Sequence, residues 1–222
     1  MFEQNVVRCG VQHFLRGPAK ILGGEHAAFQ LARPLERLGL FPTSNAAHLF
    51  PSADDHSFAR KFAAKFRQPI VALHPGSGSD RKNWPVEKWL SLGESLLSSG
   101  QVASLLIVGG EADGNQLRVF RSTLRTDAVH FAEHLPLPHL AAVLKACILF
   151  LGHDSGISHI AAAVGTQCVL LFGPTEPRVW APANENVQIL RSARRAVDDL
   201  RMQDVLKAAS AVSLSSSEAV SS

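Results

Sequence analysis

Apolar runs recur at regular intervals from residue 69 onwards, and most of them end in a short loop of glycine and polar residues. Five runs are expected to be strands, because they are largely apolar and are bounded by turn-forming residues: 69–74, 102–108, 129–131, 148–151 and 168–172. Strands that are apolar on both faces are typical of a parallel sheet covered by helices on both sides. The pattern predicts a doubly wound α/β domain over residues 69–212.

Segments of helical periodicity separate these strands. One helix is expected between Asn83, as its N-cap, and Gly100, and another between Asp113, as its N-cap, and about Leu124. Three more are expected over 137–145, 155–164 and 198–212, the last closing the domain.

Residues 1–68 have a different pattern. Two helices are expected, over 25–38 and 57–66, and no apolar strand stands out. This region cannot be a complete α/β domain by itself, so we interpret it as a remnant of a second domain with a linker. The Ser-rich tail, 213–222, is expected to be disordered.

Composition narrows the class of protein only slightly. The 222 residues carry a net charge of +3, with scattered Lys and Arg, so no nucleic-acid partner is expected, and the cluster of Arg191, Arg194 and Arg195 is interpreted as a solvated face. No apolar run reaches the ~18 residues of a membrane span and no secretory signal is present, which favours a cytoplasmic location. Cys147 and Cys168 lie in or beside apolar strands and are expected to be buried free thiols.

Four loops follow expected strands: 75–83, 109–113, 152–156 and 173–178. In a doubly wound sheet, ligands bind at the carboxyl ends of the strands, where these loops lie. In the first loop, Ser77 and Gly78 offer donors to a phosphate and Lys82 offers a charge, although a plain strand-to-helix turn is the alternative. His74, just before this loop, is either a core or a site residue. Glu111, in the second loop, is placed either to hold a ribose diol or to lie in solvent.

The loop over 152–156 combines an anion site with a carboxylate. Ser155 and Gly156 open a helix, so their N–H groups face outward, and Ser158 and His159 lie one turn further on. Asp154 beside them would accept hydrogen bonds from sugar hydroxyls, hold a divalent metal, or cap the helix, capping being the simplest. The chain has no HExxH or CxxC pattern, so no metal and no cofactor are expected, and no GxSxG pattern indicates a serine hydrolase.

Taken together, these motifs resemble the C-terminal domain of glycosyltransferase family 9, the lipopolysaccharide heptosyltransferases. The resemblance covers residues 69–182, and a further segment, 26–40, is similar to a helix near the end of that family's N-terminal domain. The motifs that carry it are Ala72–Gly78 with Arg81–Pro85, Ile107–Glu111, Asp154–Ala163 and Leu171–Pro177.

The resemblance implies a GT-B fold of two Rossmann-like domains, of which the second binds a nucleotide-sugar donor, typically ADP-heptose. It implies inverting transfer of the sugar to a lipopolysaccharide core, a lipid-linked saccharide at the inner membrane surface. By the family pattern, Ser77 and Lys82 contact the diphosphate, Glu111 holds the ribose and Asp154 contacts the donor sugar. Residues expected around the phosphates or in support are Gly78, Ser155, Gly156, Ser158 and His159.

One departure from the family concerns residues 1–68. Family members begin with a complete acceptor domain that carries a catalytic carboxylate, whereas here no glycine-rich first strand and loop precede residue 69. The general base that inverting transfer needs is therefore unassigned. A non-catalytic nucleotide-sugar-binding module, or an inactive truncated copy, is the alternative function. A GT-B-related epimerase is disfavoured, because Ile157-Ser158-His159 stands where such enzymes have a Glu-rich helix.

Overall fold

A six-stranded parallel sheet forms the centre of the computed structural model, which describes residues 6–9, 13–16 and 20–218. Its strands are β3 (Ile70–Leu73), β4 (Ser104–Gly109), β5 (Val129–Glu133), β6 (Leu149–His153), β7 (Gln167–Phe172) and β8 (Val187–Arg191). The order across the sheet is β5-β4-β3-β6-β7-β8. The predicted doubly wound α/β fold is confirmed.

The strand order places a topological switch point between β3 and β6. From β3 the chain moves outward through β4 to β5, then returns to pair β6 with β3 and continues outward in the other direction. At such a point two adjacent crossovers leave on opposite faces, which opens a crevice outside the carboxyl ends of the two strands. The loops that follow β3 and β6 contain Ser77, Lys82 and Asp154.

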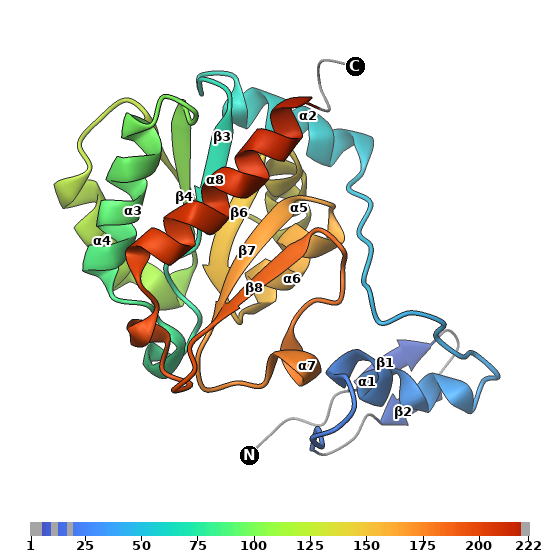
Figure 1. Ribbon diagram of the computed structural model, residues 1–222. Helices are drawn as coiled ribbons and strands as arrows, with labels where there is room; N and C mark the ends of the chain where they lie inside the picture. The colour runs from blue at the N-terminus through green and yellow to red at the C-terminus, as the bar shows by residue number, and fades with distance from the viewer. Residues whose placement is uncertain (1–5, 10–12, 17–19, 219–222) are drawn as a thin grey trace.

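Helices cover both faces of the sheet (Figure 1). On one face lie α3 (Val86–Ser98), α4 (Gly114–Thr123) and α8 (Met202–Glu218); on the other lie α2 (Ala53–Ala63), α5 (Leu137–Lys145) and α6 (Gly156–Ala163). Alternate residues of each strand point to opposite faces. In β3, Val71 and Leu73 pack against the first helix layer, while Ile70 and Ala72 pack against the second. Burial on both faces explains the uninterrupted apolar runs.

The N-terminal part of the chain contains two short paired strands, which the sequence did not reveal because neither is an apolar run. β1 (Val6–Cys9) pairs antiparallel with β2 (His13–Arg16), and α1 (Ala27–Glu36) follows. Figure 1 shows α1 beside α7 (Pro177–Trp180), where Nε2 of His26 lies 2.7 Å from the carbonyl oxygen of Ala181. The boundary drawn at residue 68 stays a prediction.

Several predicted boundaries need correction. The helix expected from residue 57 begins at Ala53, because Ser52 and Asp55 form a capping box. The tail expected to be disordered is helical as far as Glu218 within α8, and residues 219–222 lie outside the described residues. β8 was not predicted, because it is an edge strand with several exposed positions. Across the described residues, no helix is both long and apolar enough to cross a bilayer.

Candidate functional site

The four predicted loops follow four adjacent strands, β4, β3, β6 and β7. Their carboxyl ends therefore line one edge of the sheet, as the parallel arrangement requires. With strands ~4.8 Å apart, three intervals between them span about 14 Å. An edge of this width can accommodate an extended ligand whose parts contact different loops.

Lys82 and Asp154 form an ion pair across the switch point. Lys82 ends a 3-10 turn, η1 (Asp80–Lys82), and its Nζ lies 2.9 Å from Asp154 Oδ2 and 3.3 Å from the Asp154 carbonyl oxygen. The side chains are 29% and 11% exposed, so the pair is partly shielded from solvent. The alternative that Asp154 caps the helix was wrong, because Ser155 occupies the N-cap and accepts from the Ser158 N–H.

The loop after β3 is held by its own side chains. The Ser77 hydroxyl lies 2.6 Å from Asn83 Oδ1 and 2.9 Å from the Ser79 carbonyl oxygen, and its one proton is shared between these two acceptors. Asn83 is therefore not the helix N-cap that the sequence suggested; α3 begins three residues later, at Val86, after Pro85. Gly78 has a φ of +70°, which favours glycine at this turn. For its hydroxyl to reach a phosphate, Ser77 would have to release Asn83.

The N-terminus of α6 faces the same edge. Gly156 is exposed, and a Cβ at this position would meet no atom within 4 Å, so space is open in front of the helix. The Ser158 side chain, by contrast, is fully buried and donates to the His153 carbonyl oxygen. The hydroxyl of Ser158 therefore supports the loop from beneath, and any contact between this side chain and a ligand would be indirect.

Glu111 and Asp113 lie on η2 (Glu111–Asp113), after β4, but differ in burial. Glu111 is exposed, and its side chain makes no hydrogen bond or ion pair with the described residues. Asp113 is buried and accepts the Gly110 N–H at 2.8 Å. Burial would raise the pKa of Asp113, but hydrogen bonds from His74 and Gly110 outweigh it and lower the pKa. Asp113 is the N-cap residue of α4, as predicted, but its side chain makes no capping hydrogen bond to that helix.

His74 connects three loops at the switch point. It follows β3, is 3% exposed, and lies between the loops after β4 and β6. Nε2 of His74 lies 3.4 Å from Asp113 Oδ2, and Nδ1 lies 3.3 Å from the Ser155 hydroxyl oxygen. The imidazole thus joins the loop that carries Glu111 to the cap of α6.

His153, the last residue of β6, connects this strand to the loop after β3. Its Nε2 accepts the Trp84 N–H at 2.8 Å, so the ring proton is on Nδ1, which donates to the Gly76 carbonyl oxygen 3.3 Å away. Burial lowers the pKa of His153 to about 3, so the ring is neutral. No pattern in the sequence singled out His153, because it ends a buried strand like any core residue.

His159 lies on α6, half-buried, one turn after Asp154. Burial lowers its pKa, while Asp154 and a hydrogen bond to the Trp180 backbone act in the opposite direction. His159 therefore connects α6 to α7, with the partly exposed Trp180 beside it. Of the predicted residues, Lys82, Asp154, Ser155 and His159 are joined by contacts, whereas Glu111 is connected to them only through Asp113 and His74.

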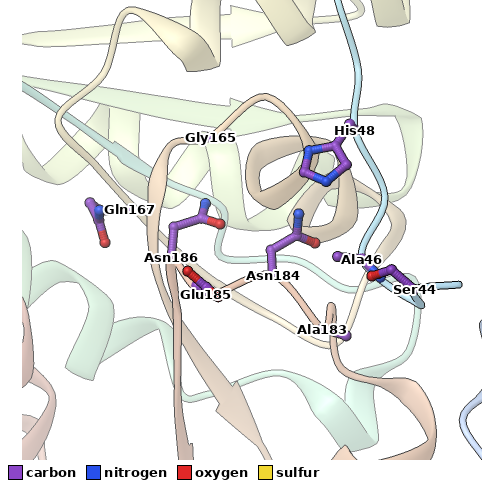
Figure 2. A pocket seen from close by; sticks show the side chains of 9 residues that line it. All are labelled: Ser44, Ala46, His48, Gly165, Gln167, Ala183, Asn184, Glu185 and Asn186. Carbon is purple, nitrogen blue, oxygen red and sulfur yellow. The ribbon is translucent and has the colours of Figure 1, made fainter.

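A separate hollow of about 670 Å³ lies at the opposite, amino edge of the sheet. It is bordered by the segment between α1 and α2 and by the residues before β7 and β8 (Figure 2). Figure 2 shows His48 near Asn184, whose Nδ2 donates to the Ala47 carbonyl oxygen at 2.8 Å. Among the described residues, no group of three or more His, Cys, Asp or Glu side chains could hold a metal ion.

The sheet order and the crevice define the class: a doubly wound α/β domain of the nucleotide-binding type. The sequence profile of glycosyltransferase family 9 (heptosyltransferase) matches residues 28–210. Because this match covers most of the chain, the chain belongs to glycosyltransferase family 9, and the resemblance seen in the motifs is confirmed.

Individual relatives match the chain over part of their length. Lipooligosaccharide heptosyltransferase 2 of Haemophilus influenzae is 29% identical over 137 residues, 60% of this chain and 40% of the relative. Lipopolysaccharide heptosyltransferase 1 of Escherichia coli is 28% identical over 140 residues, 62% of this chain and 42% of the relative. The matched part is thus about two fifths of each of these curated relatives.

Solved structures of the family share the fold. The glycosyl transferase family 9 protein from Veillonella parvula superposes with a TM-score of 0.76 at 23% identity, covering 86% of this chain and 61% of that one. Escherichia coli heptosyltransferase WaaC with ADP gives 0.63 at 19% identity, covering 82% and 55%. These likenesses confirm a Rossmann-like domain of the GT-B kind.

Proposed function

We propose that this chain carries the donor site of a heptosyltransferase, which binds a nucleotide-linked heptose, ADP-heptose by the family pattern, in the crevice between β3 and β6. The Lys82–Asp154 pair is the observation that supports this most directly. It places one cation and one carboxylate side by side in front of the open N-terminus of α6. A diphosphate next to a sugar needs both charges, the cation for the phosphates and the carboxylate for the hydroxyls.

In this proposal, ligand binding rearranges the ion pair. The Lys82 ammonium turns from Asp154 to the diphosphate, which also accepts N–H groups at the start of α6. Asp154, freed from Lys82, accepts hydrogen bonds from the sugar hydroxyls. Glu111, exposed and unpaired among the described residues, is placed on the adjacent loop to hold the ribose.

Transfer also requires an acceptor and a base. We propose that the acceptor is a lipid-linked saccharide of the lipopolysaccharide core, reached at the inner surface of the membrane from the cytoplasm. An inverting transfer needs a carboxylate that deprotonates the acceptor hydroxyl. In the family pattern this base belongs to the N-terminal domain, so the residues of the donor crevice orient the sugar and bind the leaving diphosphate.

Calorimetry with ADP-heptose and with ADP tests the donor site. Lys82→Met should weaken both ligands by about 1.5–3 kcal/mol, roughly 10- to 150-fold in Kd, as for a lost hydrogen bond to a charged group. Asp154→Ala should weaken ADP-heptose more than ADP. Lys61→Met, on the exposed surface of α2, is the matched control and should bind as the wild type does. Equal affinity of Lys82→Met and wild type would refute the site.

A non-catalytic binding module is the second candidate function. It is a candidate because the roles proposed for the crevice residues are binding roles and include no general base. A transfer assay on the same protein separates the two functions. Donor binding without product would support the binding module, whereas a heptosylated acceptor would exclude it.

A further inference from the structure

Two buried titratable residues, His74 and Asp113, lie behind the proposed donor crevice and have no part in the function described so far. Their side chains are 4% and 8% exposed, and Nε2 of His74 lies 3.4 Å from Asp113 Oδ2. The lowered pKa of Asp113 makes it a carboxylate, so the Nε2 of His74 must carry a proton. The question is whether Nδ1 carries one as well.

The number of protons available around Ser155 decides whether Nδ1 of His74 is protonated. The Ser158 hydroxyl donates to the His153 carbonyl oxygen, so its proton is used. The Ser155 oxygen lies 3.3 Å from His74 Nδ1 and 3.1 Å from the Ser158 oxygen, and has one proton for two contacts. If Nδ1 has no proton, one of these contacts joins two lone pairs. If Nδ1 is protonated, it donates to Ser155, Ser155 donates to Ser158, and every contact contains one proton.

Protonation of Nδ1 also saturates the Ser155 oxygen. This atom then accepts from His74 and from the Ser158 N–H at 3.4 Å, and it donates once. A hydroxyl oxygen offers two lone pairs and one proton, so nothing remains for a ligand. Ser155 would therefore contact a phosphate through its backbone N–H and not through its side chain.

We propose that His74 is a positioning residue for the donor diphosphate: an imidazolium, held by Asp113, that fixes the Ser155 cap and turns positive charge toward the N-terminus of α6. The inference rests on the proposed donor site. The pair is a dipole whose carboxylate lies on the far side of the ring from Ser155. The field of this dipole adds to the attraction of the helix N-terminus for an anion.

Among the described residues, Asp113, from η2, and the neutral His153, from β6, interact with this ring electrostatically. α6 contributes the hydroxyls of Ser155 and Ser158, and Phe150 presents its ring 6.5 Å away. Lys82 acts on His153 from the loop after β3 and is paired with Asp154.

Ring-nitrogen NMR tests the charge state without any ligand. In wild-type protein near neutral pH, both nitrogens of His74 should have the shifts of protonated nitrogen, and Asp113→Asn should make one of them unprotonated. An unprotonated Nδ1 in the wild type would overturn the assignment. This arm gives an answer even if the protein binds no nucleotide sugar, so it separates failure of the inference from failure of the proposed function.

Binding measurements test the positioning role. ADP-heptose is the probe, since its bridging diphosphate has no group that titrates near neutral pH. Near neutral pH, His74→Gln should bind ADP-heptose roughly 3- to 10-fold more weakly than the wild type, because glutamine carries no positive charge. His48→Gln, at the opposite edge of the sheet, is the matched control and should bind as the wild type does. Equal affinity of His74→Gln and the wild type would refute the role.

Discussion

Substitution of Gly76 by alanine tests how tightly the loops at the switch point are packed. A Cβ at Gly76 would lie 1.6 Å from Asp113 Oδ1 and 2.4 Å from its Cγ, far inside contact distance. The backbone of Gly76 is not in the left-handed region, so alanine is disfavoured by this collision alone. The Asp113 carboxylate must move away, and the hydrogen bonds that hold it must break.

The cost follows from those bonds. The carboxylate accepts the Gly110 N–H at 2.8 Å and faces His74 Nε2 at 3.4 Å, both inside the fold. Hydrogen bonds to a charged group contribute about 1.5–3 kcal/mol each, and the longer bond, to His74, is assigned the lower value of this range. Gly76→Ala should therefore lower the free energy of unfolding by about 3–5 kcal/mol. With a urea m-value of about 2 kcal/mol per molar, the midpoint should fall by about 2 M.

Equilibrium unfolding in urea measures this, with Gly114→Ala as the matched control. Gly114 begins α4 with a φ of −56°, and a Cβ there meets nothing within 4 Å, so alanine should be neutral or stabilise by up to about 1 kcal/mol. Adding Asp113→Ala to Gly76→Ala removes the colliding atoms, and the two changes together should cost less than their sum. A Gly76→Ala protein within about 0.5 kcal/mol of the wild type would refute the reasoning.

Three further predictions concern buried groups. Burial lowers the pKa of His153 from 6.5 to about 3, so the unfolded chain binds a proton that the folded chain does not, and stability should fall as the pH drops from 6.5 toward 3. This one group can contribute at most about 1.4 kcal/mol per pH unit to the slope of unfolding free energy against pH. His153→Gln should remove this contribution and make the slope smaller. An identical slope in the variant and the wild type would contradict the neutral ring. Trp84→Phe removes the bond from Nε1 to the Leu200 carbonyl oxygen, 3.0 Å long, and should lower the free energy of unfolding by about 1–2 kcal/mol in a urea titration, whereas no loss would show that the bond contributes nothing. Burial raises the pKa of Cys147 and Cys168 to about 12, so a maleimide should label them only after unfolding, and mass spectrometry that finds either labelled in native protein would contradict their burial.

The sequence was most informative where burial is complete on both faces. Ile70–Leu73 and Cys168–Phe172 have no polar position, so their strands stand out as continuous apolar runs. Val187–Arg191 was missed, because an edge strand buries less of its surface and includes the exposed Gln188 and Ile189. The order of the strands could not be derived from the chain, since pairing depends on crossovers and not on local pattern.

The candidate site could likewise be predicted from the sequence only in part. Glycine and polar residues after each strand identified the loops, because the direction of parallel strands places their ends together. The pairing of Lys82 with Asp154 depends on β3 and β6 being neighbours, a contact between residues 72 positions apart. His153 gave no signal and Asp113 only that of a helix cap, because a buried polar side chain is recognised by its partners, and the partners of these two include residues of other loops.

The central claim is that a nucleotide sugar binds at the carboxyl ends of β3 and β6. Amide chemical-shift mapping during a titration with ADP-heptose tests it most directly. The account predicts the largest shifts in the loop from Ser77 to Lys82 and at Ser155 and Gly156, at the start of α6. Shifts confined to the opposite edge, at Gly165 and Asn184, where the hollow of Figure 2 lies, would contradict it.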